Sequence, residues 1–243
     1  TRCGRDFDFV APHLADHRLI RLDYRGRGGS DWARNVADYS VPRESADVLE
    51  LLDHLNLDQV AILGTSRGGL NAMYLAATAH DRLLGVALND VGPQLEKSGL
   101  DLICDYIGRR PNATTHQQAA EIRAKTVIGF DTVPLSRWIE EAERLYTQET
   151  DGLHLRYDPK VRDAFLAAFD GGDLPTAWPL FDALAGLPIA LIHGATSDLL
   201  SRDTALEMKR RRPDMVLTHV PDRGHVPFLD EPQAINALND WIG

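Results

Sequence analysis

The stretch that most constrains the fold of this chain is residues 60–70, where a short apolar run meets the pattern Gly-x-Ser-x-Gly and continues into a helical pattern. A sharp strand-to-helix turn at this pattern would expose the hydroxyl of Ser66. Because the helix would begin directly after the serine, the backbone N–H of Arg67 would face the reacting carbonyl. Gly64 and Gly68 lack a Cβ, which would let the strand and the helix approach closely. The stretch therefore predicts a nucleophilic serine with one oxyanion donor.

Apolar runs separated by helical patterns lie on both sides of this stretch. We expect strands at residues 18–24, 60–63, 83–88, 188–194 and 215–220. We expect helices at residues 5–16, 42–55, 201–212 and 231–242, and a further helix directly after Ser66. Strands that are apolar on both faces and alternate with helices form parallel sheets. The expected fold class is therefore α/β, with a predominantly parallel sheet and helices on both faces.

The alternation stops between residues 94 and 182, where the pattern is helical and no comparable strand is expected. Turns such as Thr132-Val133-Pro134 separate the helices, whose faces carry more aromatic residues than the rest of the chain. Simple packing accounts for most of these side chains. We nevertheless expect residues 94–182 to form a helical cap that supplies apolar walls for a substrate. The cap would be inserted into a core formed by residues 1–93 and 183–243.

Two residues that could complete the site of Ser66 follow later strands. Asp198 lies in the loop after the strand expected at 188–194, and His225 lies after the last expected strand. Ligand sites in open parallel sheets gather at the carboxyl ends of the strands, so the three side chains should meet at one edge. The chain order Ser, Asp, His is also the one expected on this architecture. We expect His225 to take the proton of Ser66, and Asp198 to fix the imidazole tautomer.

Asp90 and His193 are the alternatives to these two residues, because they lie at or near the ends of other expected strands. We expect Asp90 to brace the turn at residues 89–93 and Asp198 to be the acid. We expect a structural role for His193, since no fitting acid follows it in the chain. The remaining histidines are scattered singly, and surface or core positions account for them.

The net charge of −10 limits the partners of the chain, because no basic stripe could release phosphate counterions from a nucleic acid. The one basic block, residues 209–212, closes an expected helix, where positive charges suit the negative helix end. We therefore expect a small-molecule substrate and no nucleic-acid partner.

Other classes of protein are disfavoured by what the sequence lacks. Only Cys3 and Cys104 occur, which favours a reducing compartment over a disulfide-stapled protein. No apolar run approaches the roughly eighteen residues of a membrane span, and no signal-peptide pattern is visible. We expect a cytoplasmic protein with no membrane partner. A dinucleotide fingerprint would need glycine at Asp31, and no His, Cys and Asp cluster has metal spacing, so no cofactor and no metal are expected.

Four motifs give the chain a resemblance to the α/β-hydrolase fold superfamily, and in particular to its capped, esterase-like or lactonase-like serine hydrolases. The motifs are Asp23-x-Arg25-Gly26-x-Gly28-x-Ser30, Gly64-x-Ser66-x-Gly68, the turn at Asp198, and Gly224-His225. The resemblance implies cleavage of a small ester or lactone through an acyl-enzyme on Ser66. Carbon–carbon bond hydrolysis of a dicarbonyl acid is one alternative, because such enzymes share these motifs. A non-catalytic ligand-binding protein on the same scaffold is the other.

Members of this superfamily place a strand hairpin and a central strand before the helix expected here at 5–16, whereas the present chain begins at Thr1. We therefore expect roughly 30–50 further residues upstream in the expressed protein. The resemblance puts the second oxyanion N–H just after a His-Gly turn at the end of that central strand. We accordingly expect this second donor upstream of Thr1.

The side chain of Arg67 has two interpretations. A cation beside the nucleophile would select substrates that carry a carboxylate or another anionic group, which makes Arg67 a candidate substrate-binding residue. The simpler interpretation is an ion pair with a nearby acid, and we expect this ion pair.

Overall fold

The computed structural model describes residues 1–169 and 176–243. The chain divides into two compact units, each of which is assembled from two segments of the sequence. One unit contains Thr1–Tyr39 and Asp101–Gly171, and the other contains Ser40–Leu100 and Gly172–Gly243. The second unit holds the stretch around Ser66, and we call it the sheet unit.

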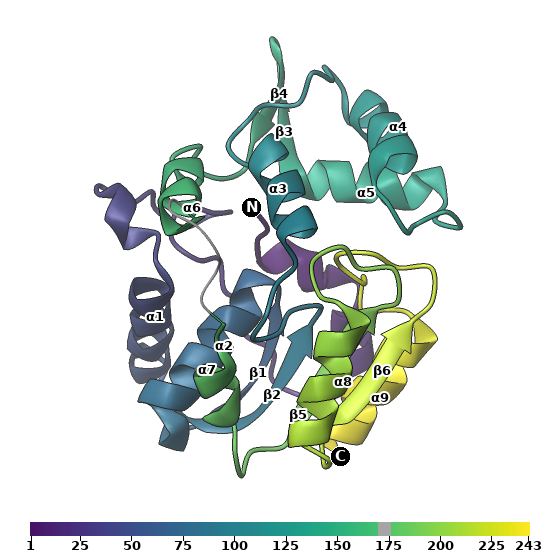
Figure 1. Cartoon of the computed structure of the whole chain (residues 1–243). Helices are drawn as coiled ribbons and strands as arrows, with labels where there is room; N and C mark the ends of the chain where they lie inside the picture. Colours follow the sequence, from purple (N-terminus) through teal and green to yellow (C-terminus); the bar gives the residue numbers. More distant parts are fainter. Residues whose placement is uncertain (170–175) are drawn as a thin grey trace. The chain divides into compact units, whose positions relative to one another are not determined.

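A four-stranded parallel sheet forms the centre of the sheet unit (Figure 1). The strands lie in the order β1 (Val60–Thr65), β2 (Leu83–Asn89), β5 (Ile189–Gly194) and β6 (Val216–Val220). Each neighbouring pair is parallel, with Gly64 opposite Leu88 and His193 opposite His219. The four strands therefore end at the same edge of the sheet, and the expected parallel α/β class is confirmed.

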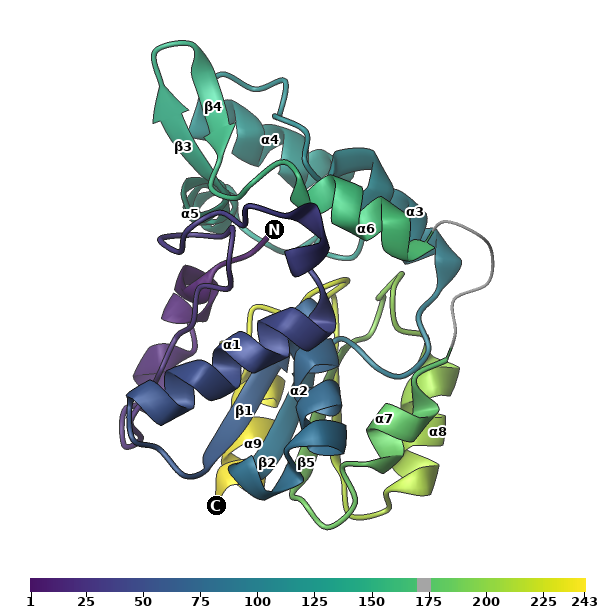
Figure 2. The same ribbon diagram turned by 90° about the vertical axis from the view of Figure 1, so that its left-hand side faces the viewer.

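Helices cover both faces of this sheet. They are α1 (Val41–His54), α2 (Arg67–Thr78), α7 (Trp178–Asp182), α8 (Arg202–Arg211) and α9 (Pro232–Ile242). Figure 2 shows α1 and α2 in front of the sheet and α9 behind it, where α9 packs on β5 and β6. The two central strands are the most buried, because neighbouring strands flank them on both sides; Val86, Leu88, Leu191 and Ile192 are completely inaccessible to solvent. This burial explains why β2 and β5 read as continuous apolar runs.

Our expectation of a strand at residues 18–24 is wrong, because within the described residues this segment pairs with no strand. Its apolar side chains are not covered either, since Leu19 is 42% and Ile20 is 40% exposed. An apolar pattern becomes a strand only where a neighbour accepts its backbone hydrogen bonds. The helix expected at residues 5–16 consists of two short 3₁₀ turns, Gly4–Asp8 and Ala11–Leu14. Further 3₁₀ turns are Val36–Asp38 and His80–Arg82.

The first unit is mainly helical, with α4 (His116–Thr126), α5 (Leu135–Leu145) and α6 (Val161–Phe169). Helix α3 (Lys97–Tyr106) spans the boundary between the two sets of residues. We expected no strand comparable to those of the parallel sheet in residues 94–182, and the structure adds a short antiparallel hairpin there, formed by β3 (Tyr146–Glu149) and β4 (Gly152–Leu155). Two strands of four residues joined by a tight turn are too short to leave a clear alternating pattern in the sequence.

Residues 1–39 pack with the helical segment through the glycine-rich loop at 23–30. Gly28 donates its N–H to the Arg156 carbonyl at 2.9 Å, and the Gly26 carbonyl accepts the Asp158 N–H at 2.8 Å. The hydroxyl of Tyr39 donates to the buried Asp158 carboxylate at 2.5 Å. Burial and this carboxylate raise the pKa of Tyr39 to about 12. The division into a core of 1–93 with 183–243 and a cap of 94–182 stays a prediction.

Across both described ranges of the chain, we find no helix with the length and apolar character that crossing a membrane requires.

Candidate active site

Ser66 occupies a strained turn between the end of β1 and the start of α2. Its backbone angles are φ 50° and ψ −117°, a combination that a residue with a Cβ rarely adopts. The Ser66 N–H donates to the Asn89 carbonyl at 3.0 Å, which extends the β1–β2 pairing into the turn. The Gly69 N–H donates to the Ser66 carbonyl at 2.8 Å, so the helix is established within one turn of the serine. The surrounding sheet and helix therefore hold the strained conformation.

Two glycines allow the close approach of strand and helix at this turn. A Cβ on Gly64 would lie 2.6 Å from the backbone nitrogen of Gly69, and one on Gly69 would lie 2.4 Å from Cγ1 of Val91. For Gly68, by contrast, no atom of the described residues lies within 4 Å of such a Cβ. The expected role of Gly64 is confirmed, whereas the role that we expected for Gly68 belongs to Gly69.

His225 follows β6 and contacts two polar side chains at the carboxyl edge of the sheet. Its Nε2 lies 3.0 Å from Oγ of Ser66, and its Nδ1 lies 2.8 Å from Oδ2 of Asp90. An ionised carboxylate can only accept hydrogen bonds, so the Asp90 contact requires the proton on Nδ1 of a neutral ring. Nε2 is then the acceptor that faces the serine hydroxyl. This arrangement is the one in which an imidazole can remove the serine proton.

The carboxylate at His225 belongs to Asp90 and not to Asp198, which corrects our expectation. Asp90 directly follows β2, and its positive φ of 53° turns the chain at the strand end. Its N–H donates to the Ile192 carbonyl at 2.8 Å, which keeps this turn at the sheet edge. The side chain of Asp198 is partly exposed, and its backbone carbonyl accepts from Oγ of Ser98 at 3.2 Å. Asp90 was the alternative acid in the sequence.

Asp90 is completely buried, and its carboxylate is held by three donors. Oδ1 accepts the Gly194 N–H at 2.8 Å. Oδ2 accepts the hydroxyl of Ser197 at 2.6 Å in addition to Nδ1 of His225. A buried carboxylate stays ionised at low cost only when such donors replace its water shell. Sequence reasoning did not single out Ser197, and the one signal for it is its position in the loop that follows β5.

The side chain of Arg67 forms the ion pair that we expected from the simpler interpretation. Its Nε lies 2.6 Å from Oε2 of Glu44, whose side chain is fully buried on α1. Asn71 donates to the same Glu44 oxygen at 3.3 Å. The backbone N–H of Arg67 is the first of α2, directly after Ser66. These contacts favour a structural role for the side chain over the selection of anionic substrates.

His193 is buried in the sheet unit and has structural partners. Its Nε2 lies 2.9 Å from the Leu200 carbonyl, and its Nδ1 lies 2.8 Å from Nδ1 of His219. Burial, together with the neighbouring His193 and Arg202, lowers the pKa of His219. The structural role that we expected for His193 agrees with these contacts.

A group of possible metal ligands lies on the β3–β4 hairpin, although we expected no such cluster. Glu149, Asp151 and His154 bring ligand atoms within 4.8 Å of one another. The sequence spacing did not reveal this group because the antiparallel pairing brings the three residues together. Nε2 of His154 lies 2.6 Å from Asp151, and Arg110 contacts the other Asp151 oxygen at 3.2 Å. The carboxylates are exposed and already paired, which is typical of a surface ion-pair network.

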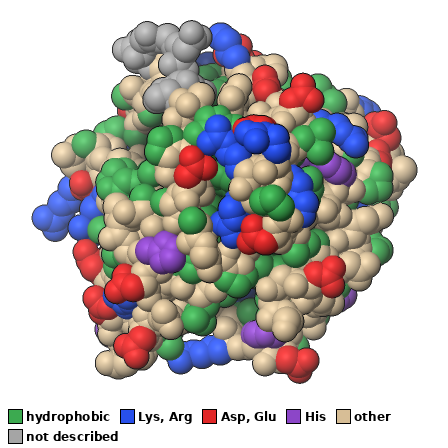
Figure 3. Space-filling model, turned by 60° about the horizontal axis from the view of Figure 1, so that its bottom comes forward, with side chains coloured by type: hydrophobic (Ala, Val, Ile, Leu, Met, Phe, Trp, Pro, Cys, Tyr) green, Lys and Arg blue, Asp and Glu red, His purple; other side chains and the backbone are tan. Residues whose placement is uncertain are grey.

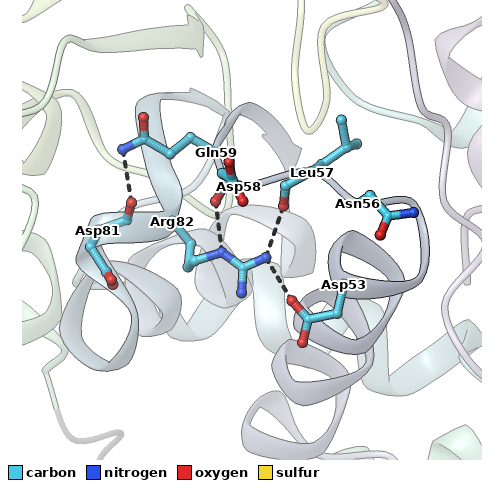
Figure 4. Close-up of a pocket in the computed structure, with 7 residues that line it drawn as sticks. All are labelled: Asp53, Asn56, Leu57, Asp58, Gln59, Asp81 and Arg82. Carbon is cyan, nitrogen blue, oxygen red and sulfur yellow. Dashed lines mark hydrogen bonds and ion pairs between the residues drawn. The ribbon is translucent and has the colours of Figure 1, made fainter.

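A surface hollow of about 600 Å³ lies at the opposite edge of the sheet from Ser66 (Figure 4). Its lining residues come just before β1 and β2, at the amino ends of the strands: Asp53, Asn56, Leu57, Asp58, Gln59, Asp81 and Arg82. Arg82 donates to the carbonyls of Asp58 and Leu57 at 2.7 and 2.9 Å. These contacts tie the two strand starts together, so the hollow belongs to the scaffold.

The basic side chains at residues 209–212 form ion pairs and hydrogen bonds with other residues of the chain. Arg210 and Arg211 pair with Glu207, and Arg212 pairs with Asp214. Lys209 donates to the Met215 carbonyl at 2.6 Å. Figure 3 shows acidic side chains among the basic ones on the face that it presents. The contacts agree with a structural role for the block, and the expected lack of a nucleic-acid partner stays a prediction.

Comparison with known proteins supports a hydrolase. A family model described as the alpha/beta hydrolase family matches residues 3–238. A 3-hydroxybutyrate-oligomer hydrolase from Cupriavidus necator is 35% identical, over 97% of this chain and 83% of that protein. The crystal structure of an alpha/beta hydrolase from Novosphingobium aromaticivorans has a TM-score of 0.91 at 35% identity, covering 99% of this chain and 85% of the other. A 2-(acetamidomethylene)succinate hydrolase from Mesorhizobium japonicum is 24% identical, over 97% of this chain and 82% of that protein.

Proposed function

We propose that this chain, which belongs to the alpha/beta hydrolase family, is a serine hydrolase that cleaves a small ester or lactone through an acyl-enzyme on Ser66. The observation that carries the proposal is the continuous set of contacts from Oγ of Ser66 to His225, at 3.0 Å, and from His225 to Asp90, at 2.8 Å. Without a base and an acid in these positions, a serine hydroxyl is a weak nucleophile.

In the first half of the reaction, Oγ of Ser66 attacks the carbonyl carbon of the substrate while Nε2 of His225 takes the hydroxyl proton. The ring becomes an imidazolium, and the buried Asp90 carboxylate stabilises its positive charge. As the tetrahedral intermediate collapses, the bond to the leaving oxygen breaks and His225 returns the proton to that oxygen. An ester releases an alcohol at this point, whereas the hydroxyl from a lactone stays attached to the acyl group.

In the second half, water takes the place of the leaving alcohol. His225 removes a proton from the water, whose oxygen attacks the acyl carbon, and the proton then returns to Oγ of Ser66. The products are a carboxylic acid and the free serine, so no redox partner is required. The backbone N–H of Arg67 would donate to the oxyanion in both halves, because it begins a helix at the nucleophile. The second oxyanion donor stays a prediction.

The choice of substrate class rests on the relatives. The protein from Cupriavidus necator is named for the hydrolysis of 3-hydroxybutyrate oligomers, in which an ester joins one hydroxy acid to the next. We infer that short esters of hydroxy acids are the first substrates to test. The carbon–carbon alternative receives less support, because two relatives named for other reactions, a putative 2-succinyl-6-hydroxy-2,4-cyclohexadiene-1-carboxylate synthase and the 2-(acetamidomethylene)succinate hydrolase, are only 25% and 24% identical.

The proposal is tested with a fluorophosphonate probe and a substrate panel on the purified chain. Wild type should label at Ser66 and hydrolyse a 3-hydroxybutyrate dimer, a p-nitrophenyl ester or a lactone, while Ser66→Ala should lose labelling and turnover. Ser98→Ala serves as the matched control, since the Ser98 hydroxyl donates to the Asp198 carbonyl and not to a group of the proposed site. It should label like wild type.

Two results would overturn the proposal in different ways. Turnover of a dicarbonyl acid with no cleavage of any ester or lactone would favour the carbon–carbon hydrolase. Absence of both labelling and turnover in a folded wild-type protein would favour a ligand-binding protein.

A further inference from the structure

We propose that Ser197 is a positioning residue for the Asp90 carboxylate, and that through Asp90 it sets both the orientation and the basicity of His225. The inference rests on the proposed function of Ser66, His225 and Asp90. Ser197 touches neither the substrate-facing oxygen of Ser66 nor the reacting Nε2, so its action passes through Asp90. The contact that carries the inference is the 2.6 Å distance from Oγ of Ser197 to Oδ2 of Asp90.

The direction of this hydrogen bond is fixed by the loop that follows β5. Oγ of Ser197 accepts the N–H groups of Leu199 at 3.2 Å and Leu200 at 3.1 Å. A hydroxyl oxygen has two lone pairs and one proton. With both lone pairs engaged by backbone donors, the single proton can point only at Asp90. Ser197 is therefore locked as a donor and cannot rotate away during the reaction.

The Asp90 oxygen that accepts this proton is the same one that contacts His225. Oδ2 lies 2.6 Å from Ser197 and 2.8 Å from Nδ1 of His225, while Oδ1 is held by the Gly194 N–H. The three donors come from two loops and fix the plane of the carboxylate. Removal of the Ser197 proton would leave one donor on each oxygen and allow the carboxylate to turn about its terminal bond.

The hydroxyl also competes with His225 for the charge of Asp90. Hydrogen bonds to an ionised group are stronger than those between neutral groups. Without the Ser197 proton, more of the negative charge would act on the imidazolium, which would favour the protonated ring. The acidic limb of the pH profile should therefore move to higher pH, and this is a change that a purely structural serine would not produce.

The chain offers a matched structural serine in Ser201, which caps the start of α8. Its Oγ accepts the Thr204 N–H at 3.3 Å. Ser201→Ala should lower thermal stability through the lost cap without affecting Asp90. Ser197→Thr is the conservative variant, because threonine keeps a hydroxyl that can donate to Asp90.

The test measures kcat, KM and the pH profile of kcat/KM for wild type, Ser197→Ala, Ser197→Thr and Ser201→Ala, with thermal unfolding of each. In Ser197→Ala we expect kcat to fall roughly tenfold with KM little changed, as small misplacements of catalytic groups produce. The midpoint of the acidic limb should rise by about half a pH unit or more. Ser197→Thr should recover most of both effects, and Ser201→Ala should show neither.

The inference is overturned if Ser197→Ala keeps the wild-type kcat and midpoint, or if Ser197→Ala and Ser201→Ala lose activity only in proportion to their lost stability. A wild type that does not label at Ser66 would contradict the proposed function instead. In that case, the titration of the His225 ring followed by NMR in wild type and Ser197→Ala still decides the matter. A higher titration midpoint of His225 in the variant supports the positioning role of Ser197, and an unchanged midpoint contradicts it.

Discussion

Asp90 and Asp198 follow neighbouring strands of one sheet, yet their surroundings differ completely. Asp90 comes directly after β2, is fully buried and has donors on both carboxylate oxygens. Asp198 lies further along the loop after β5, where its side chain is partly exposed. A carboxylate that is buried among fixed donors holds one orientation, whereas an exposed one is free to sample several. The hydrogen-bond donors around a carboxylate, and not its place in a motif, therefore determine which aspartate contacts His225.

The largest difference that we expect between the two aspartates is their effect on catalytic turnover. Asp90→Asn should lower kcat/KM by about 10³–10⁴-fold, because an amide cannot stabilise the imidazolium and favours the wrong tautomer. Asp198→Asn should stay within about twofold of wild type, since its side chain does not contact His225 in the described structure. Steady-state kinetics on one ester substrate measure both. A large loss in Asp198→Asn with an active Asp90→Asn would restore our original choice of acid.

The second prediction compares buried and exposed carboxylates by their contribution to the free energy of unfolding, where we expect a smaller effect. Arg67→Met should lower the free energy of unfolding by roughly 2–3 kcal/mol, because it leaves the Glu44 carboxylate buried without its cation. The matched control is Arg43→Met, in which the exposed Arg43 guanidinium loses its pairs with Asp47 and Glu50, and it should cost less than about 1 kcal/mol. Urea denaturation of the two variants gives the values. Equal losses in the free energy of unfolding would mean that burial does not determine how much these ion pairs stabilise the protein.

The Arg67 variant also separates stability from substrate choice. If the guanidinium selects anionic substrates, Arg67→Met should lose more kcat/KM on an anionic ester than on a neutral ester of the same acyl group. From the Glu44 contact we expect equal changes on both substrates.

The smallest effect concerns the pH dependence of stability at His219 in β6. Because burial lowers the pKa of His219, the unfolded chain binds this proton more readily than the folded one. The stability that this group contributes is therefore present above its ordinary pKa of about 6.5 and is lost as the pH falls below that value. His219→Asn keeps a donor nitrogen for His193 and should flatten the dependence between pH 5 and 7. His54→Asn, at an exposed position, is the control for the replacement of a histidine by asparagine.

The sequence predicted the sheet and the serine turn because both depend on local patterns. The run into Ser66 combines a strand, a glycine at the point of closest approach and a helix, and each of these features is encoded within a few residues of the others. The strands β2 and β5 were equally readable, since buried parallel strands are apolar on both faces. His225 followed from its place after the last strand.

The features that the sequence did not predict depend on contacts between distant segments. The choice between Asp90 and Asp198 is made by donors at Gly194 and Ser197, which the chain brings together only when β2 pairs with β5. Residues 18–24 carry a strand pattern, but strand formation also needs a hydrogen-bonding neighbour. An ion pair of Arg67 was expected from the sequence, but its partner Glu44 was not, because that pairing depends on the packing of α1 against α2.

Ser66, Asp90, Ser197 and His225 all belong to the sheet unit, and the Ser66 N–H is bonded to Asn89, the residue before Asp90. The spacing of nucleophile and acid is therefore set by the register of β1 against β2. An evolving or engineered chain can consequently vary residues 101–169 in length and composition without altering that register. On this basis, the geometry of the reacting groups is encoded within the sheet unit alone.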